Sequence, residues 1–229
     1  MVLAAGYGQR MRPLTLSRPK PLVEVAGRAL IDHGFDRLRA AGVETAIVNV
    51  HYLAEQMEQW ARRQAALRIA ISDERAELLD TGGGVARALP LLGGDPFFVI
   101  NSDSFWLERG EPALDRLRRT WDDATMDCLL LLCPLPQTVG YDGTGDFVRA
   151  EDGRLQRKSK AAGEPLAYIG GYLVHPRLFE GAPKGAFSMN RLWDGAIAAG
   201  RLFGLVHHGR WLHVGTPDAI AHAEAAMKD

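Results

Sequence analysis

The sequence predicts an α/β protein with a Rossmann-like, mostly parallel sheet, helices on both faces and a small C-terminal elaboration. Short apolar runs alternate with helix-like segments from the first residue onward, which is the pattern of parallel strands joined by covering helices. In addition, 47% of the 229 residues are hydrophobic, enough to bury a full core within one domain of ordinary size. The alternation favours the α/β class, and the hydrophobic content argues against a disordered chain.

Strands are expected where the apolar runs lie between turn residues. They cover Val2–Ala5, Thr45–Val50, Arg68–Ser72, Phe97–Asn101, Asp127–Cys133, Ala167–Val174 and Leu202–Val206. Helices are expected between and after these runs, over Ala29–Ala41, Ala54–Gln64, Val85–Leu91, Pro112–Thr120, Arg191–Ala199 and Pro217–Met227.

Breaker residues support several of these boundaries. Gly42 is expected to end the first helix, because glycine readily takes the left-handed conformation that closes helices. Pro217 is expected to begin the last one, since proline is favoured in a first turn. The segment Leu135–Gly163 holds glycines and charges with little periodicity, which indicates hairpin turns beside the sheet. Because no Pro/Gly/Ser-rich linker divides the chain, residues 1–229 are predicted to form a single domain.

The charge balance and the cysteines exclude several classes of function. With 27 basic and 28 acidic side chains the formal net charge is −1, so no global field favours nucleic acid or an acidic membrane, and any anion site must be local. No run approaches the roughly 20 apolar residues of a membrane span, and the start lacks a signal peptide's features, so a cytoplasmic protein is predicted. Cys128 and Cys133 should point to opposite faces of one strand, which excludes a disulfide framework and a cysteine zinc site.

The loop after the first predicted strand is the first candidate site, because ligands bind at the carboxyl ends of strands in doubly wound sheets. Gly6 and Gly8 would let its backbone N–H groups approach an anion. The dinucleotide fingerprint nevertheless fails, since Met11 occupies the place of its third glycine, and the Walker motif is absent.

Charge in this segment is strongly one-sided. No acid occurs from Met1 to Val23, whereas four cations do: Arg10, Arg12, Arg18 and Lys20. Nearby prolines stiffen the segment, which suits a loop that holds several donors around a polyphosphate. The composition alone is equally compatible with an ordinary turn carrying solvated arginines.

A longer pattern decides between these interpretations. The run Leu3-Ala4-Ala5-Gly6-x-Gly8-x-Arg10-Met11-x-Pro13-Leu14-Thr15, followed by Pro19-Lys20-Pro21-Leu22, resembles the signature of the sugar-1-phosphate nucleotidylyltransferases. Three further stretches match: Thr81-Gly82-Gly83-Gly84, Asn101-Ser102-Asp103 and Trp211-x-x-Val214-Gly215-Thr216-Pro217. The resemblance implies a Mg²⁺-assisted reaction in which a sugar 1-phosphate attacks the α-phosphorus of a nucleoside triphosphate and pyrophosphate leaves.

The resemblance also implies catalytic roles. Arg10 would hold the β and γ phosphates that leave, Lys20 the phosphates at the reaction centre, and Asp103 the Mg²⁺ ion, whose preference for hard oxygen ligands suits a carboxylate. Transfer of this kind needs positioning and cations more than covalent help. Arg12 and Arg18 are interpreted as solvated or packing side chains.

Position 213 departs from the family pattern. The family commonly carries an aspartate there as a second metal ligand, but this chain has His213. Imidazole is a poor ligand for Mg²⁺ and a better one for Mn²⁺ or Co²⁺. His213 is therefore kept as a candidate metal ligand, with a water-mediated role or no metal role as open alternatives.

The remaining candidates concern the base and the sugar. The glycines after Asp80 and Thr81 would allow close approach of a flat base, although a plain helix-opening turn is the alternative. The complete nucleotide-binding set is Leu3, Ala4, Ala5, Gly6, Gly8, Gln9, Arg10, Lys20, Asp80, Thr81, Gly82 and Gly83. Sugar contacts are expected from Asn101, Asp146 and Gly171, while Lys158 and Lys160 are either phosphate contacts or solvated lysines.

Within the family, the Thr-Gly-Gly-Gly stretch after an acid and the Gly143–Phe147 turn resemble the N-acetylmuramate-1-phosphate uridylyltransferases. The expected substrates are therefore UTP and N-acetylmuramate 1-phosphate, in cell-wall recycling. Mannose-1-phosphate guanylyltransferase is the alternative within the family. Outside it, the alternatives are a non-catalytic nucleotide or nucleotide-sugar binding module and a glycosyltransferase, although Asp103-Ser104-Phe105 lacks the second acid of the usual Asp-x-Asp metal motif. The sequence carries no prediction of oligomeric state.

Overall fold

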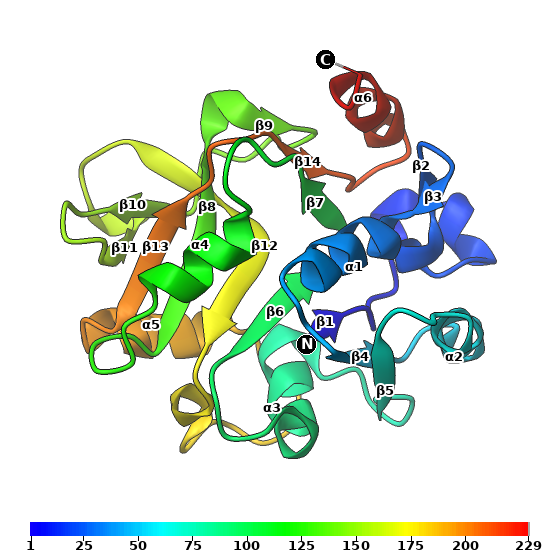
Figure 1. The fold of residues 1–229 in the computed structure, drawn as a ribbon, viewed down its shortest axis with the longest axis horizontal. Coiled ribbons are helices and arrows are strands. Elements are labelled where there is room, and N and C mark those ends of the chain that lie inside the picture. The colour runs from blue at the N-terminus through cyan, green and yellow to red at the C-terminus, as the bar shows by residue number, and fades with distance from the viewer. Residues whose placement is uncertain (229) are drawn as a thin grey trace.

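A central sheet organises the computed structural model, which describes residues 1–228 (Figure 1). Its parallel half has the order β6 (Phe97–Asn101), β1 (Val2–Leu3), β4 (Thr45–Val50) and β5 (Arg68–Asp73). Strand β1 is shorter than the predicted Val2–Ala5, because the Ala4 N–H donates to the Asn49 side chain at 2.7 Å and the chain turns into a loop. The parallel strands leave their carboxyl ends on one edge.

The other half of the sheet contains the antiparallel strands. Strand β12 (Pro165–Val174) pairs antiparallel with both β6 and β8 (Cys128–Pro134), and β8 pairs parallel with β13 (Leu202–Val206). The predicted hairpin region supplies β10 (Phe147–Arg149) and β11 (Leu155–Arg157) at the sheet edge. Because only β11 and β12 run against the others in residues 1–228, the prediction of a mostly parallel sheet is confirmed.

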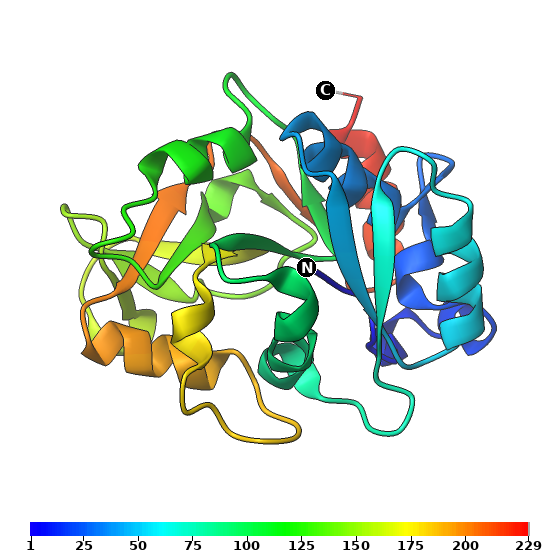
Figure 2. The ribbon, with the colours of Figure 1, turned by 60° about the horizontal axis from the view of Figure 1, so that its bottom comes forward.

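Helices cover both faces, as predicted. Figure 2 shows α1 (Leu30–Ala40) and α4 (Ala113–Thr120) on one side of the sheet and α3 (Asp80–Leu92) and α5 (Asn190–Ala198) on the other. Helix α2 (Ala54–Arg62) shares its buried core with α1 and α4. Cys133 lies in that core and Cys128 in the core beneath α3 and α5, so the two free thiols do face opposite ways.

Helix α3 begins earlier than predicted. The expected start was Val85, but the helix runs from Asp80, so Gly82, Gly83 and Gly84 lie inside its first turns. Glycine is a poor helix former, which is why propensity alone places the start too late. The tertiary contacts described below explain why these positions stay glycine.

The predicted elaboration is a second, smaller sheet. It consists of β7 (Ser104–Trp106), β14 (Trp211–His213) and β9 (Thr138–Val139), and α6 (Asp218–Ala226) packs against it. A hairpin of β2 (Glu24–Val25) and β3 (Arg28–Ala29) lies beside α6, where the Ala26 N–H donates to Glu224 at 2.8 Å (Figure 1). The small sheet ties the end of the chain to the segment that follows β6.

Short 3-10 turns complete the described secondary structure. They are η1 (Gln9–Met11), η2 (Leu14–Leu16), η3 (Lys20–Leu22), η4 (Leu135–Gln137), η5 (Lys158–Lys160) and η6 (Pro176–Phe179). In residues 1–228, no helix has the length and apolar character that crossing a bilayer requires.

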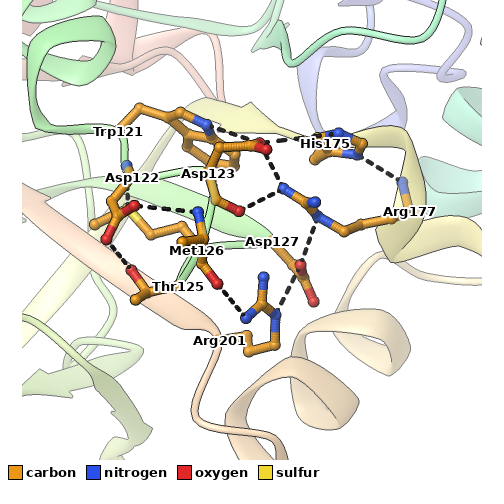
Figure 3. Close-up of polar contacts among 10 residues, drawn as sticks. Trp121, Asp122, Asp123, Thr125, Met126, Asp127, His175, Arg177 and Arg201 are labelled. Carbon is orange, nitrogen blue, oxygen red and sulfur yellow. Dashed lines mark hydrogen bonds and ion pairs between the residues drawn. The ribbon is translucent and has the colours of Figure 1, made fainter.

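An ionic cluster joins the ends of three strands of the central sheet (Figure 3). Asp127 precedes β8, Arg177 follows β12 and Arg201 precedes β13, so one carboxylate meets two guanidinium groups, at 3.0 and 2.9 Å. Arg177 also reaches Asp123. The cluster links three neighbouring strand ends and lies away from the strand ends where ligands are expected.

Candidate active site

A cleft of about 650 Å³ opens where β1 and β6 end. The loop after β1 forms one wall, and Asn101, Ser102 and Asp103 after β6 form another. The predicted residues that line it are Leu3, Ala4, Ala5, Gly6, Gly8, Gln9, Arg10, Lys20, Asp80, Thr81, Asn101 and Asp103. The structure therefore brings most of the predicted nucleotide and catalytic residues into one cleft.

The loop after β1 is folded by Gly8. This residue has φ of 63°, a left-handed conformation, and a Cβ there would lie 2.9 Å from the Lys20 Cβ. The Gly8 carbonyl accepts hydrogen bonds from the Met11 N–H at 2.9 Å and the Thr15 hydroxyl at 2.8 Å. Met11, at the place of the missing third glycine, is fully buried. Glycine at position 8 thus lets the loop close over Lys20.

Lys20 and Asp103 form an ion pair at the base of the cleft, with 3.1 Å between Nζ and a carboxylate oxygen. Lys20 is 8% exposed. Burial by itself raises the pKa of Asp103. The nearby positive charge of Lys20 opposes this effect most strongly, with smaller contributions from His213 and Arg10, so that the pKa of Asp103 lies below the ordinary aspartate value. Asp103 is therefore ionised at neutral pH, and the cleft holds a fixed negative charge among cations.

His213 and Arg10 flank Gly215 beside this ion pair. A Cβ on Gly215 would lie 2.9 Å from the His213 ring and 3.4 Å from the Arg10 guanidinium. Burial lowers the pKa of His213, more than the neighbouring Asp103 raises it, so the imidazole is neutral at pH 7. Its Nδ1 lies 3.2 Å from the Gly140 carbonyl. When Nδ1 carries the proton and donates there, Nε2 keeps a free lone pair.

Asn49 and Glu74 form a buried polar pair that sequence reasoning missed, and Asn49 itself lines the cleft. Asn49 donates to Glu74 at 2.8 Å and accepts from the Ala4 N–H at 2.7 Å, while Glu74 also accepts from the Leu79 N–H at 3.2 Å. Burial raises the pKa of Glu74. The pair connects the loop after β1 to the start of α3. The available signal was an asparagine inside the apolar run of β4, a position where a polar side chain needs a buried partner.

The glycines at the start of α3 serve packing. The N–H groups of Gly82 and Gly83 donate to the Phe187 carbonyl at 2.9 and 3.1 Å, and Cβ atoms there would overlap Phe187 or Gly185. Neither glycine lines the cleft, whereas Asp80 and Thr81 do. Gly82 and Gly83 therefore contact the 185–187 segment, and their contact with a base stays a prediction.

A smaller pocket of about 210 Å³ adjoins the cleft and shares Leu3, Asp80, Thr81 and Asn101 with it. Asp146 lines this pocket, where its carboxylate accepts from the Tyr168 N–H at 2.9 Å. Further lining residues that sequence reasoning did not single out are Tyr168, Tyr172, Ser188, Met189, Asn190 and Trp193. Aromatic walls with a few polar groups are typical of sites for sugars and other small molecules.

Gly171 lies elsewhere. A Cβ on Gly171 would lie 3.2 Å from the ring of Trp106, so this residue faces the core and lines neither pocket. Its neighbour Gly170, with φ of 84°, lies beside the Asn101 side chain instead. Side-chain packing around Trp106, which the sequence pattern does not reveal, determines this placement.

The other basic residues considered in the sequence analysis lie outside both pockets. Arg18 pairs with Glu24 at 3.4 Å on the surface, and Arg12 is exposed outside the cleft lining, in agreement with their interpretation as solvated side chains. Lys158 and Lys160 lie on η5 and line neither the cleft nor the smaller pocket. Arg157, the residue before them, does line the smaller pocket.

This arrangement of charges suits phosphoryl or nucleotidyl transfer. Arg10 and Lys20 supply positive charge where a polyphosphate would lie, and Asp103 supplies a hard oxygen ligand at the same place. In the described chain, no set of three or more His, Cys, Asp or Glu side chains could hold a metal ion. Asp103 and His213 together therefore provide at most two protein ligands.

Comparison with known proteins also indicates a protein that transfers nucleotidyl groups. The pattern of the nucleotidyl transferase family matches residues 1–229. N-acetylmuramate alpha-1-phosphate uridylyltransferase of Caulobacter vibrioides is 47% identical over 233 residues, covering 100% of this chain and 96% of that protein. The enzyme of the same name from Neisseria meningitidis serogroup B is 35% identical over 98% of this chain and 96% of its own length.

More distant proteins are similar in sequence or in fold. The catalytic subunit beta of mannose-1-phosphate guanylyltransferase from Xenopus tropicalis is 28% identical over 95% of this chain and 61% of that protein. UDP-glucose pyrophosphorylase, solved with UDP-glucose, superposes with a TM-score of 0.81 at 18% identity, over 99% of this chain and 97% of the other. Because the family pattern matches the whole chain and two relatives exceed 30% identity over nearly their full length, the chain belongs to the nucleotidyl transferase family.

Proposed function

We propose that this protein joins uridine monophosphate from UTP to N-acetylmuramate 1-phosphate and releases pyrophosphate. The observation that carries the reaction class is the cluster of Arg10, Lys20 and Asp103 in one cleft of a nucleotidyl transferase fold. The 47% identity to an N-acetylmuramate alpha-1-phosphate uridylyltransferase supports the choice of substrates.

The chain's own residues would act by positioning charge. The loop from Leu3 to Gly8 would hold the nucleotide with its backbone, and Arg10 would neutralise the departing β and γ phosphates. Lys20, held by Asp103, would keep the attacking phosphate and the α-phosphate together, because two anions repel unless a cation lies between them. Transfer would then be a direct displacement in which the bond to the sugar phosphate forms as the bond to pyrophosphate breaks.

The site fits a divalent cation whose remaining ligands come from the substrate. Mg²⁺ is commonly held by one or two carboxylates together with phosphate oxygens and water, and Asp103 is an ionised carboxylate beside the phosphate-binding cations. When bound, the ion would offset charge on the transferring phosphate. Neutral His213 is a candidate second ligand, and its imidazole would favour Mn²⁺ or Co²⁺ over Mg²⁺ more than an aspartate would.

The sugar would occupy the smaller pocket. Asn101 lies at the boundary of the two pockets, and Asp146 lies further in, beside Tyr168 and Trp193. Asp80 and Thr81 also line both pockets, so they would contact the nucleotide near its junction with the sugar. The single domain, the cytoplasmic location and the lack of nucleic-acid and membrane partners stay predictions of the sequence.

A matrix of substrates tests the proposal. UTP, GTP, dTTP, CTP and ATP would each be combined with N-acetylmuramic acid 1-phosphate, mannose 1-phosphate and glucose 1-phosphate, and pyrophosphate release measured with Mg²⁺, Mn²⁺ or Co²⁺. UTP with N-acetylmuramic acid 1-phosphate should give the highest kcat/KM. If kcat/KM for GTP with mannose 1-phosphate is higher by tenfold or more, the proposed substrates are wrong but the reaction type stands. If no pair of substrates yields pyrophosphate, the protein is a binding module and not an enzyme.

A further inference from the structure

The smaller pocket contains one basic side chain among its described lining residues, Arg157. The other charged groups in the lining are Asp80 and Asp146. Asp146 is already engaged by the Tyr168 N–H at 2.9 Å. Sugar hydroxyls do not require a guanidinium group, so the presence of Arg157 in this lining needs an explanation.

Arg157 is held rigidly at this place. Its Nε donates to Asp194 at 2.8 Å, one terminal nitrogen donates to the Asn190 carbonyl at 3.2 Å, and the guanidinium lies 4.7 Å from the centre of the Phe147 ring. The side chain is 20% exposed. Contacts from β10 and from α5 therefore fix the plane of the guanidinium before any substrate binds, which reduces the entropy lost on binding.

The guanidinium keeps donors for a further partner. It has five N–H groups, and within residues 1–228 the protein hydrogen bonds use one on Nε and one on a terminal nitrogen. Asp194 is 61% exposed, so water screens that ion pair and it leaves much of the positive charge effective. A carboxylate that entered the pocket would lose more water and would interact more strongly with the same cation.

The nearby cations do not share this position. Arg149 donates to the Gly204 carbonyl at 2.8 Å and lines neither pocket, and Lys158 and Lys160 also lie outside the lining. Charge and region alone do not distinguish these four residues in the sequence. The structure separates them, because only Arg157 has its side chain both at the pocket and fixed by neighbours.

We propose that Arg157 is a specificity-determining residue that binds the carboxylate of an acidic substituent on the sugar. This inference rests on the proposed function, in which the sugar is N-acetylmuramic acid 1-phosphate, whose lactyl ether carries that carboxylate. N-acetylglucosamine 1-phosphate has the same ring, acetamide and phosphate without the lactyl group. Arg157 thus distinguishes the two sugars by charge, while Asn101 and Asp146 contact features that they share.

The test compares Arg157→Gln with wild type, using UTP and each of these two sugar phosphates. The substitution should raise KM for N-acetylmuramic acid 1-phosphate by about tenfold or more, because one charge-assisted hydrogen-bonded contact is lost. The kinetic constants for N-acetylglucosamine 1-phosphate should change by less than about threefold. Where turnover of that sugar is too slow to follow, its inhibition constant against N-acetylmuramic acid 1-phosphate serves as the readout.

Two matched variants separate recognition from a structural effect. Asp194→Asn breaks the same ion pair but leaves Arg157 in place, and it should keep the selectivity. Lys160→Gln removes a neighbouring charge outside the pocket and should behave like wild type. Melting temperatures of all variants identify any that fail to fold, and Arg157→Lys, which keeps charge without the planar fork, should retain part of the selectivity.

The outcomes discriminate between this inference and the proposed function. If wild type uses N-acetylmuramic acid 1-phosphate and Arg157→Gln keeps its preference, Arg157 has no role in selectivity. Equal losses with both sugars, reproduced by Asp194→Asn, would show that Arg157 only maintains the pocket wall. If wild type with UTP turns over neither sugar phosphate, the proposed substrates are wrong and this inference falls with them.

Discussion

The most direct test of how the nucleotide loop is held is the substitution Asn49→Ala. Asn49 is 2% exposed and bridges the Ala4 N–H and the Glu74 carboxyl group, at 2.7 and 2.8 Å. Alanine removes both contacts and leaves an N–H donor and a carboxyl oxygen buried without partners. Because both Ala4 and Asn49 line the cleft, this one change should affect stability and nucleotide binding together.

The expected loss of stability follows from the two buried polar groups that lose their hydrogen-bond partner, the Ala4 N–H and the Glu74 carboxyl group. Each buried polar group without a partner costs about 1–3 kcal/mol, so Asn49→Ala should lower the free energy of unfolding by about 2–6 kcal/mol. This is a large share of the 5–15 kcal/mol typical of folded proteins. The KM for UTP should also rise several-fold, since the backbone of Ala4 loses the side chain that fixes it.

Urea unfolding at pH 7.5, followed by circular dichroism, measures the stability change. Gln56→Ala is the matched control, because this amide makes an exposed hydrogen bond to the Ser17 carbonyl at 2.8 Å and its loss should cost at most about 1 kcal/mol. If Asn49→Ala unfolds within 1 kcal/mol of wild type, or if its KM for UTP is unchanged, the bridge does not hold the loop and the reasoning fails.

Three further substitutions test the site and the core. Asp103→Asn should lower kcat by about a hundredfold or more with little change in melting temperature, because a charged ligand is lost where transition-state charge must be offset; near-normal turnover at saturating Mg²⁺ would exclude that role. His213→Asp should raise the apparent affinity for Mg²⁺ and reduce any advantage of Mn²⁺ or Co²⁺, and identical metal profiles would show that position 213 does not reach the ion. Burial lowers the pKa of His207 to about 4, despite its contact with the Leu107 carbonyl, so its contribution to stability is complete above the unfolded pKa of about 6.5 and is lost as the pH falls toward 4. Between pH 7.5 and 5 this loss is roughly 2 kcal/mol; His207→Gln should reduce the acid-induced loss by that amount in urea unfolding, and equal losses in the two proteins would contradict the assignment.

Local patterns in the sequence were enough to predict most of the parallel strands and the loop that forms one wall of the cleft. The runs Thr45–Val50 and Leu202–Val206 are strands with the predicted boundaries, because buried apolar runs between turn residues have few alternative structures. Gly42 follows the first helix with φ of 72°, as expected of a helix-closing glycine. Arg10, Lys20 and Asp103 were identifiable because their spacing resembles a family signature, and they do meet in one cleft.

Only the tertiary structure determined which residues pack against each other across long distances in the sequence. Gly82 and Gly83 contact the 185–187 segment and Gly171 faces Trp106 because chain segments far apart in sequence pack there, and glycine is needed wherever that approach is close. Local sequence does not encode such approaches.

The buried bridge of Asn49 and Glu74 and the selection of Arg157 among four nearby cations have the same origin. A hydrogen bond or an ion pair depends on distances between side chains from different strands and helices, and folding alone sets those distances. The sequence by itself determined which chemical groups are present and which elements carry them. The tertiary structure decided which groups meet, because burial and proximity, rather than residue type, determine the strength of each polar interaction.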